Sequence, residues 1–252
     1  MILLALLSLL LAAEFSNTIQ SHGDSAINWT QMRLEGTAYV EQNGASDDYA
    51  KQEARALAMA HQALKETFDH FHLDLNTTMD DISSEDPKTQ RYILANAKKY
   101  KVAQTSYKES GGVSVNVYWE IHTLMRPIIL SRASEMTTAT KPKKHTGIII
   151  DARGTDHKPV LFPEIATDNE PNWLSVKGFS RKVAETKLPF IYAPHAAHQM
   201  VIERVGNNPV IFLAKSTSAN QILIDTSFPS GLSPEDTKAI MASGNVAILL
   251  EI

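Results

Sequence analysis

The pair of histidines at His195 and His198 has the spacing in this chain that is best suited to metal chemistry. If residues 193 to 204 form a helix, side chains three positions apart lie on one face, and imidazole nitrogens are common zinc ligands. His157 or Glu203 could supply a third ligand. Such a pair more often faces solvent or a partner protein, so His195 and His198 stay candidates, and no metal or other cofactor is assigned.

Asp151 and Arg153 come directly after three consecutive isoleucines, where a buried strand gives way to a turn. In a catalytic site, Asp151 would act as an acid or nucleophile and Arg153 would clamp an anion. An Asp-x-Arg sequence at a strand exit is more often a structural ion pair, and that is the role we predict. Phosphate-binding loops, nucleophile elbows and zinc-protease motifs are absent. We therefore assign no catalytic or cofactor-binding residue and expect a protein that is not an enzyme.

Composition limits the class of protein further. The chain has 252 residues, of which 43% are hydrophobic, so it can bury one large core or two smaller ones. Its net charge is only -4 and the basic residues do not cluster, which argues against nucleic-acid binding. No cysteine occurs, so a disulfide framework and a lipidated cysteine are excluded.

The amino terminus carries an apolar run from Ile2 to Ala13 that ends at Glu14. This length suits a signal peptide and falls short of the roughly 20 residues that a membrane-spanning helix requires. We predict a signal peptide over residues 1–13 and an exported mature chain with no transmembrane segment. The alternative is a buried first strand or helix.

Residues 28–130 are expected to form a β-α-α-β-β module. An alternating strand over residues 32–41 leads into a long helix, whose apolar stripe includes Ala50, Ala54 and Leu57. Ser46 and the acids after it are placed to cap this helix. A second helix opens at Pro87, and two strands close the module in a three-stranded antiparallel sheet. The predicted fold class is thus α+β.

A second mixed α/β unit is expected over residues 146–252. Residues 131–145 are polar, rich in threonine and lysine, and are predicted to link the two units. The second unit opens with the isoleucine strand and contains a predicted helix near Ala193 to Arg204. Its last elements are strands at residues 209–215 and 221–225, a helix from Ser233 to Ala242, and a closing strand.

Several blocks together resemble a known family. These blocks are GTAYV and AKQEARALAMAHQAL in the first unit, and TGIIIDARG, KPVLFPEI, RVGNNPVIFLA and VAILLEI in the second. These blocks resemble bacterial envelope proteins related to the small flagellar-associated outer-membrane lipoproteins. The first module is similar to the amino-terminal domain of flagellar assembly protein T. The resemblance implies a non-enzymatic role, and this chain departs from the family in lacking the lipidated cysteine.

The expected function is therefore that of an exported cell-envelope protein with a structural or assembly role, and the resemblance implies a flagellar setting. It would be periplasmic or outer-membrane associated, and its partners would be other envelope or flagellar proteins or further copies of itself. Two alternatives stay open. One is a periplasmic metal-binding or hydrolytic enzyme that uses His195, His198 and Asp151. The other is a module that binds a small ligand between the two units.

Overall fold

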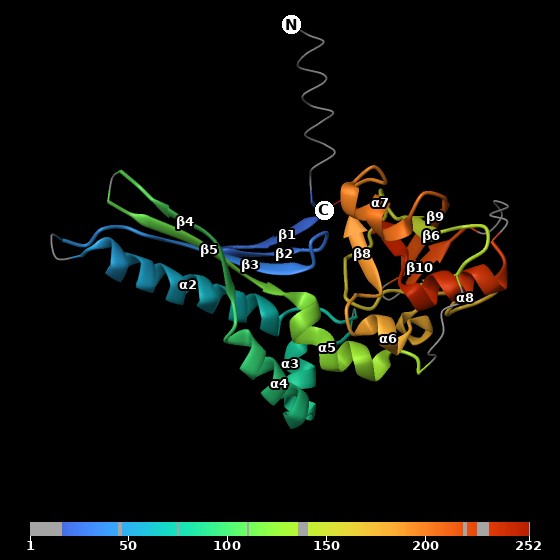
Figure 1. Cartoon of the computed structure of the whole chain (residues 1–252), viewed down its shortest axis with the longest axis horizontal. Coiled ribbons are helices and arrows are strands. Elements are labelled where there is room, and N and C mark those ends of the chain that lie inside the picture. The colour runs from blue at the N-terminus through green and yellow to red at the C-terminus, as the bar shows by residue number, and fades with distance from the viewer. Residues whose placement is uncertain are drawn as a thin grey trace, which may run out of the picture.

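The chain is an α+β protein built on two sheets, which confirms the predicted fold class (Figure 1). The computed structural model describes residues 17–44, 47–74, 76–109, 111–135, 141–218, 221–225 and 232–251. The signal peptide predicted over residues 1–13 lies outside these ranges.

The first sheet is antiparallel and has five strands, in the order β1-β2-β3-β5-β4. The first half of the chain runs through β1 (Ile19–His22), β2 (Ser25–Asn28), β3 (Arg33–Val40), α2 (Tyr49–Asp69), α3 (Met79–Glu85), α4 (Pro87–Ala97), β4 (Lys101–Tyr107), β5 (Val113–Glu120) and α5 (Ile121–Arg132). The expected three-stranded sheet was too small, because β1 and β2 form a hairpin that pairs with β3. The alternating burial of β5 matches its sequence pattern.

Helix α2 runs along one face of this sheet and begins at its cap, Asp48, whose carboxylate accepts the amide of Lys51 (Figure 1). Ser46, the predicted cap, lies outside the described residues. The buried stripe passes through Ala56, Ala60 and Leu64 and not through the expected Ala50 and Ala54. The helix lies so close to β3 that a Cβ at Gly36 would collide with the carbonyl oxygen of Ala60. Only small side chains fit at this contact.

Two further helices of the first half were not predicted. Helix α3 occupies the polar stretch after Asn76, and it begins at Thr78, whose amide and hydroxyl both donate to the Asp81 carboxylate. Helix α5 follows β5 directly although it contains Pro127. A proline here leaves the carbonyl of Thr123 without its helical donor. The hydroxyl of Tyr92 on α4 donates to that carbonyl at 3.3 Å, so the helix tolerates the proline.

The second sheet is mixed and has six strands, in the order β7-β10-β9-β6-β11-β8. The second half runs through β6 (Gly147–Asp151), β7 (Glu164–Ala166), the short 3-10 helix η1 (Val176–Gly178), α6 (Arg181–Ala184), β8 (Phe190–Ala193), α7 (Gln199–Val205), β9 (Pro209–Ser218), β10 (Gln221–Ile224), α8 (Pro234–Ser243) and β11 (Val246–Leu249). Strands β9, β6, β11 and β8 are parallel. Ile148, Ile149 and Ile150 are all buried, as parallel strands covered on both faces require.

The helix predicted near Ala193 to Arg204 begins later than expected. Residues Phe190–Ala193 form strand β8, and α7 starts at Gln199. The helix after Ser233 is placed as predicted: the Ser233 hydroxyl accepts the amide of Asp236, and Gly244 ends the helix in the left-handed conformation.

The two halves share one hydrophobic core, and a group of aromatic rings lies where they meet. Trp29, from the turn after β2, stacks on Phe71 at 5.2 Å and contacts the edge of Tyr192 on β8 at 5.5 Å. Main-chain bonds add to this contact, since the amides of Leu161 and Phe162 donate to carbonyl oxygens in the segment after α2. The turn after β2 and the segment after α2 are therefore packed directly against the second half of the chain.

That residues 131–145 act as a linker between two units stays a prediction. Arg132 at its start ends α5, and Ser134 bridges to Ser180 of the second half. The amides of Lys143 and Lys144 donate to the carboxylate of Asp236 at the start of α8. In the described parts of the chain, no helix combines the length and apolar character needed to cross a membrane.

Candidate functional site

Asp151 and Arg153 form a bidentate ion pair in the turn after β6. The Nε and Nη2 atoms of Arg153 donate to the two carboxylate oxygens at 2.8 and 2.6 Å, and the Arg153 amide donates to Oδ1 at 3.2 Å. The guanidinium holds the pKa of the Asp151 carboxyl below its usual value. A carboxylate engaged by side chain and main chain together is a poor acid or nucleophile. The ion pair is thus present, and its structural role stays a prediction.

His195 and His198 do not lie on one face of a helix, because α7 begins after both of them. His198 is the cap of α7, and its Nδ1 accepts the amide of Met200 at 3.2 Å. Burial, followed by repulsion from His195, lowers the pKa of His198. The two ring centroids are 6.0 Å apart. The spacing that suggested a metal pair instead reflects a helix start.

Neither proposed third ligand completes a metal site. His157 is buried beside Tyr192, with its Nε2 atom 3.5 Å from the tyrosine hydroxyl. Glu203 accepts a hydrogen bond from Gln199 one turn earlier on α7. Across the residues that the structure places, no three histidine or carboxylate side chains are grouped so that they could hold a metal ion.

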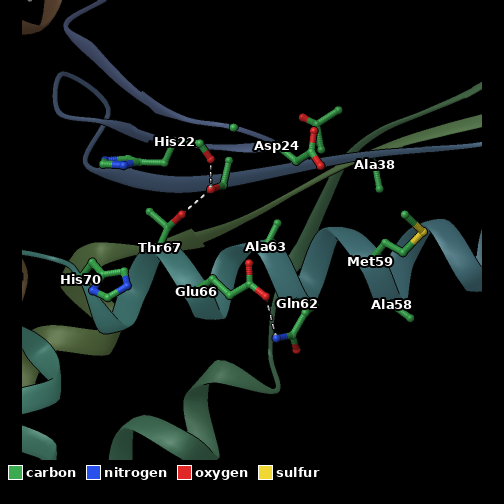
Figure 2. A pocket seen from close by; sticks show the side chains of 13 residues that line it. His22, Asp24, Ala38, Ala58, Met59, Gln62, Ala63, Glu66, Thr67 and His70 are labelled. Carbon is green, nitrogen blue, oxygen red and sulfur yellow. Dashed lines mark hydrogen bonds between the residues drawn. The ribbon is translucent and has the colours of Figure 1, made fainter.

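An open groove of about 860 Å³ lies between α2 and the hairpin of β1 and β2 (Figure 2). We call it the hairpin groove. Ala38 of β3 lies along it together with Ala58, Met59 and Ala63 of α2, and the turn around Gly23 forms the opposite wall. The groove was not predicted from the sequence, because the hairpin that forms one of its walls was not predicted. Gly23 and Asp24, between two short runs, are the two-residue turn signal that could have revealed it.

The polar groups of the groove are bonded to one another. The Ser25 hydroxyl donates to the main-chain carbonyl of His22 and is bonded to the hydroxyl of Thr67 (Figure 2). Gln62 donates to Glu66 one turn along α2. Because Ser25 contacts the carbonyl of His22 and not its ring, no serine-histidine nucleophile forms here.

Three histidines gather at one end of the groove. His22 and His70 line it, and His72 lies near enough to influence His22. Burial lowers the pKa of His22, and repulsion from His70 and then His72 lowers it further. The rest of the groove is lined mainly by uncharged side chains, together with the carboxylates of Asp24 and Glu66.

The fold and these sites define an α+β protein with an open groove, in which Asp151 and Arg153 are bonded within a turn and His198 caps a helix. Residues 147–251, from β6 to β11, match the protein family described as Treponema pallidum Tp0624, second domain. The second half of the chain is thus similar to a Treponema protein family. No curated protein matches the chain. Nothing in these comparisons supports a relationship to flagellar lipoproteins.

Proposed function

We propose that this chain is a non-enzymatic, exported protein of the cell envelope that acts by binding a helix of another protein in the hairpin groove. The proposal rests on a contrast between the residues that the sequence suggested for chemistry and the hairpin groove. Asp151, Arg153 and His198 are engaged in holding turns and a helix start, whereas the hairpin groove is open along α2. Export is supported by the apolar run at residues 2–13.

The shape of the groove favours a helix as its occupant. The stretch of α2 from Met59 to Asp69 is about 15 Å long, which corresponds to about three helical turns. Met59 and Ala63 lie one turn apart on the face of α2 that lines the groove, and the small side chain of Ala63 would let a second helix approach closely there. A helix beside α2 would extend the layer that already covers β3 and β5. Met59 is 52% exposed and its flexible side chain can adapt to a partner.

Photo-crosslinking in cells tests this idea. A photoreactive residue at position 59 should give a discrete adduct in the envelope fraction. The same residue at position 94, which is also exposed but lies on α4, should not. Ala63→Glu should abolish the adduct formed from position 59, because a charged side chain would fill the groove, while Leu94→Glu should leave it unchanged. Equal adducts from positions 59 and 94, or an adduct insensitive to Ala63→Glu, would contradict the proposal.

Export needs a separate test, because the groove would exist in any compartment. A reporter fused after residue 30 should reach the periplasm, and replacing Leu6 and Leu7 by arginine should retain it in the cytoplasm. A flagellar role is the narrower form of the proposal and depends only on the resemblance of sequence blocks. If cells that lack this protein swim normally, the flagellar role is excluded. The wider proposal of an envelope protein that binds a helix would not be affected.

A further inference from the structure

A second pocket, of about 420 Å³, lies where the two halves meet, on the side of α7. Arg33 and Glu120 line it from the first half, and Lys187, Glu203 and Arg204 line it from the second. We call it the junction pocket. Its volume lies in the range of small-molecule sites, and it is separate from the hairpin groove.

Arg204 is the unusual residue of this pocket. Its side chain is only 8% exposed, yet among the described contacts its guanidinium makes one hydrogen bond, from Nη2 to the carbonyl of Leu188 at 2.8 Å. A guanidinium has five N–H donors, and burying a charge without an opposite charge is costly. Burial lowers the pKa of Arg204 to about 9, so the group is still charged at neutral pH.

A second cation lies near Arg204 and is also held by neutral acceptors. The Lys187 ammonium donates to the carbonyl of Ser243 at 2.8 Å and to Oδ1 of Asn245 at 2.7 Å. Burial and repulsion from Arg204 lower the pKa of Lys187 to about 8.

The carboxylates that line the pocket bond elsewhere. Glu203 accepts from Gln199 at 2.8 Å, and Glu120 accepts from Lys101 at 2.6 Å. The described contacts therefore leave two neighbouring cations without a bonded anion.

We propose that the junction pocket binds a small monocarboxylate with an apolar body. The carboxylate would accept from the remaining N–H groups of Arg204, in the forked geometry that guanidinium and carboxylate favour. Leu188, Ile191 and Met200 line the same pocket and would contact the apolar body. Glu120 and Glu203 would repel a second negative charge, which argues against inorganic phosphate as the ligand.

Hexanoate is a suitable probe, with hexan-1-ol as its neutral counterpart and inorganic phosphate as the competing anion. Titration calorimetry on the full chain should detect saturable binding of hexanoate and none of hexan-1-ol, and phosphate should bind more weakly. Equal binding of the alcohol, tighter binding of phosphate, or no binding of hexanoate to the unmodified protein would each overturn the assignment.

Variants identify the site. Arg204→Met should weaken hexanoate binding more than about tenfold, because a charge-assisted bond is lost, while Lys215→Met, at a lysine of β9 outside the pocket, should not. If Arg204→Met fails to fold, Met200→Trp offers a second route, because the indole would fill the pocket from a partly buried position. Unchanged hexanoate affinity in a folded Arg204→Met protein or in Met200→Trp would place the binding elsewhere and refute the proposal.

Discussion

Protonation of His157 should destabilise this protein in mild acid. The imidazole is 5% exposed, its Nδ1 atom has no partner among the described residues, and its Nε2 atom is 3.5 Å from the hydroxyl of Tyr192. That hydroxyl already donates to the carbonyl of Val160 and accepts from its amide. Burial lowers the pKa of His157 to about 4. The folded protein therefore holds this histidine neutral.

The sign of the effect follows from the two pKa values. Between the unfolded value of 6.5 and the folded value of about 4, the unfolded chain binds a proton that the folded chain does not. Stability is thus complete above pH 6.5 and falls as the pH drops towards 4. The difference corresponds to about 3 kcal/mol in total, of which about 2 kcal/mol is lost by about pH 5.

Urea unfolding at a series of pH values measures this loss. His157→Phe keeps a ring against Tyr192 but cannot take up a proton, so its curve of unfolding free energy should fall less steeply. Between about pH 7 and about pH 5 the unmodified protein should lose about 2 kcal/mol more than the variant. His195→Gln retains His157 and should follow the unmodified protein. Parallel curves for the unmodified protein and His157→Phe would refute the reasoning, since other titrating groups are common to both.

Three further substitutions test how local contacts hold the fold, each by urea unfolding. His198→Ala should cost about 1 kcal/mol because the helix cap is lost, and His198→Ser should recover most of it; equal losses would show that the cap is not the cause. Gly36→Ala should cost about 1 to 3 kcal/mol, since the new methyl collides with the carbonyl of Ala60, and a loss within error would contradict that close contact. Arg153→Ala should cost about 1 kcal/mol or less, because the pair with Asp151 is partly solvent-exposed, and a much larger loss would mean that the pair holds more than its own turn.

The elements that sequence reasoning placed well are those whose signals are local. The helix after Ser233 carries its cap, proline, acids and terminal glycine in sequence, and each one acts as expected. Three consecutive isoleucines mark β6 because a parallel strand covered on both faces needs no polar positions. Strands β1 and β2 carry only the short turn signal at Gly23 and Asp24. They are four residues each, and β1 is largely exposed, so β1 depends on pairing with β2, and β2 on pairing with β3.

The misplaced histidine pair shows how one boundary error changes a chemical prediction. His195 and His198 share a face only if a helix is already formed at Ala193. The run Phe190–Ala193 pairs with β11 instead, so the chain is still leaving the sheet at Pro194. Pairing between strands more than fifty residues apart cannot be recognised from the histidine spacing itself.

Neither proposed binding site could have been predicted from the spacing of its residues in the sequence, because each is assembled from segments that are far apart in the chain. The hairpin groove combines the turn at residues 22–25 with the stretch of α2 from Ala58 to His70. The junction pocket combines the start of β3 with the loop before β8 and with Arg204. The short stretch from Ser25 to Arg33 contributes to both, and Trp29 in its middle is fixed between Phe71 and Tyr192. The buried indole of Trp29 therefore fixes a segment that contributes to both sites. The two sites thus depend on packing between the halves of the chain more than on any sequence motif.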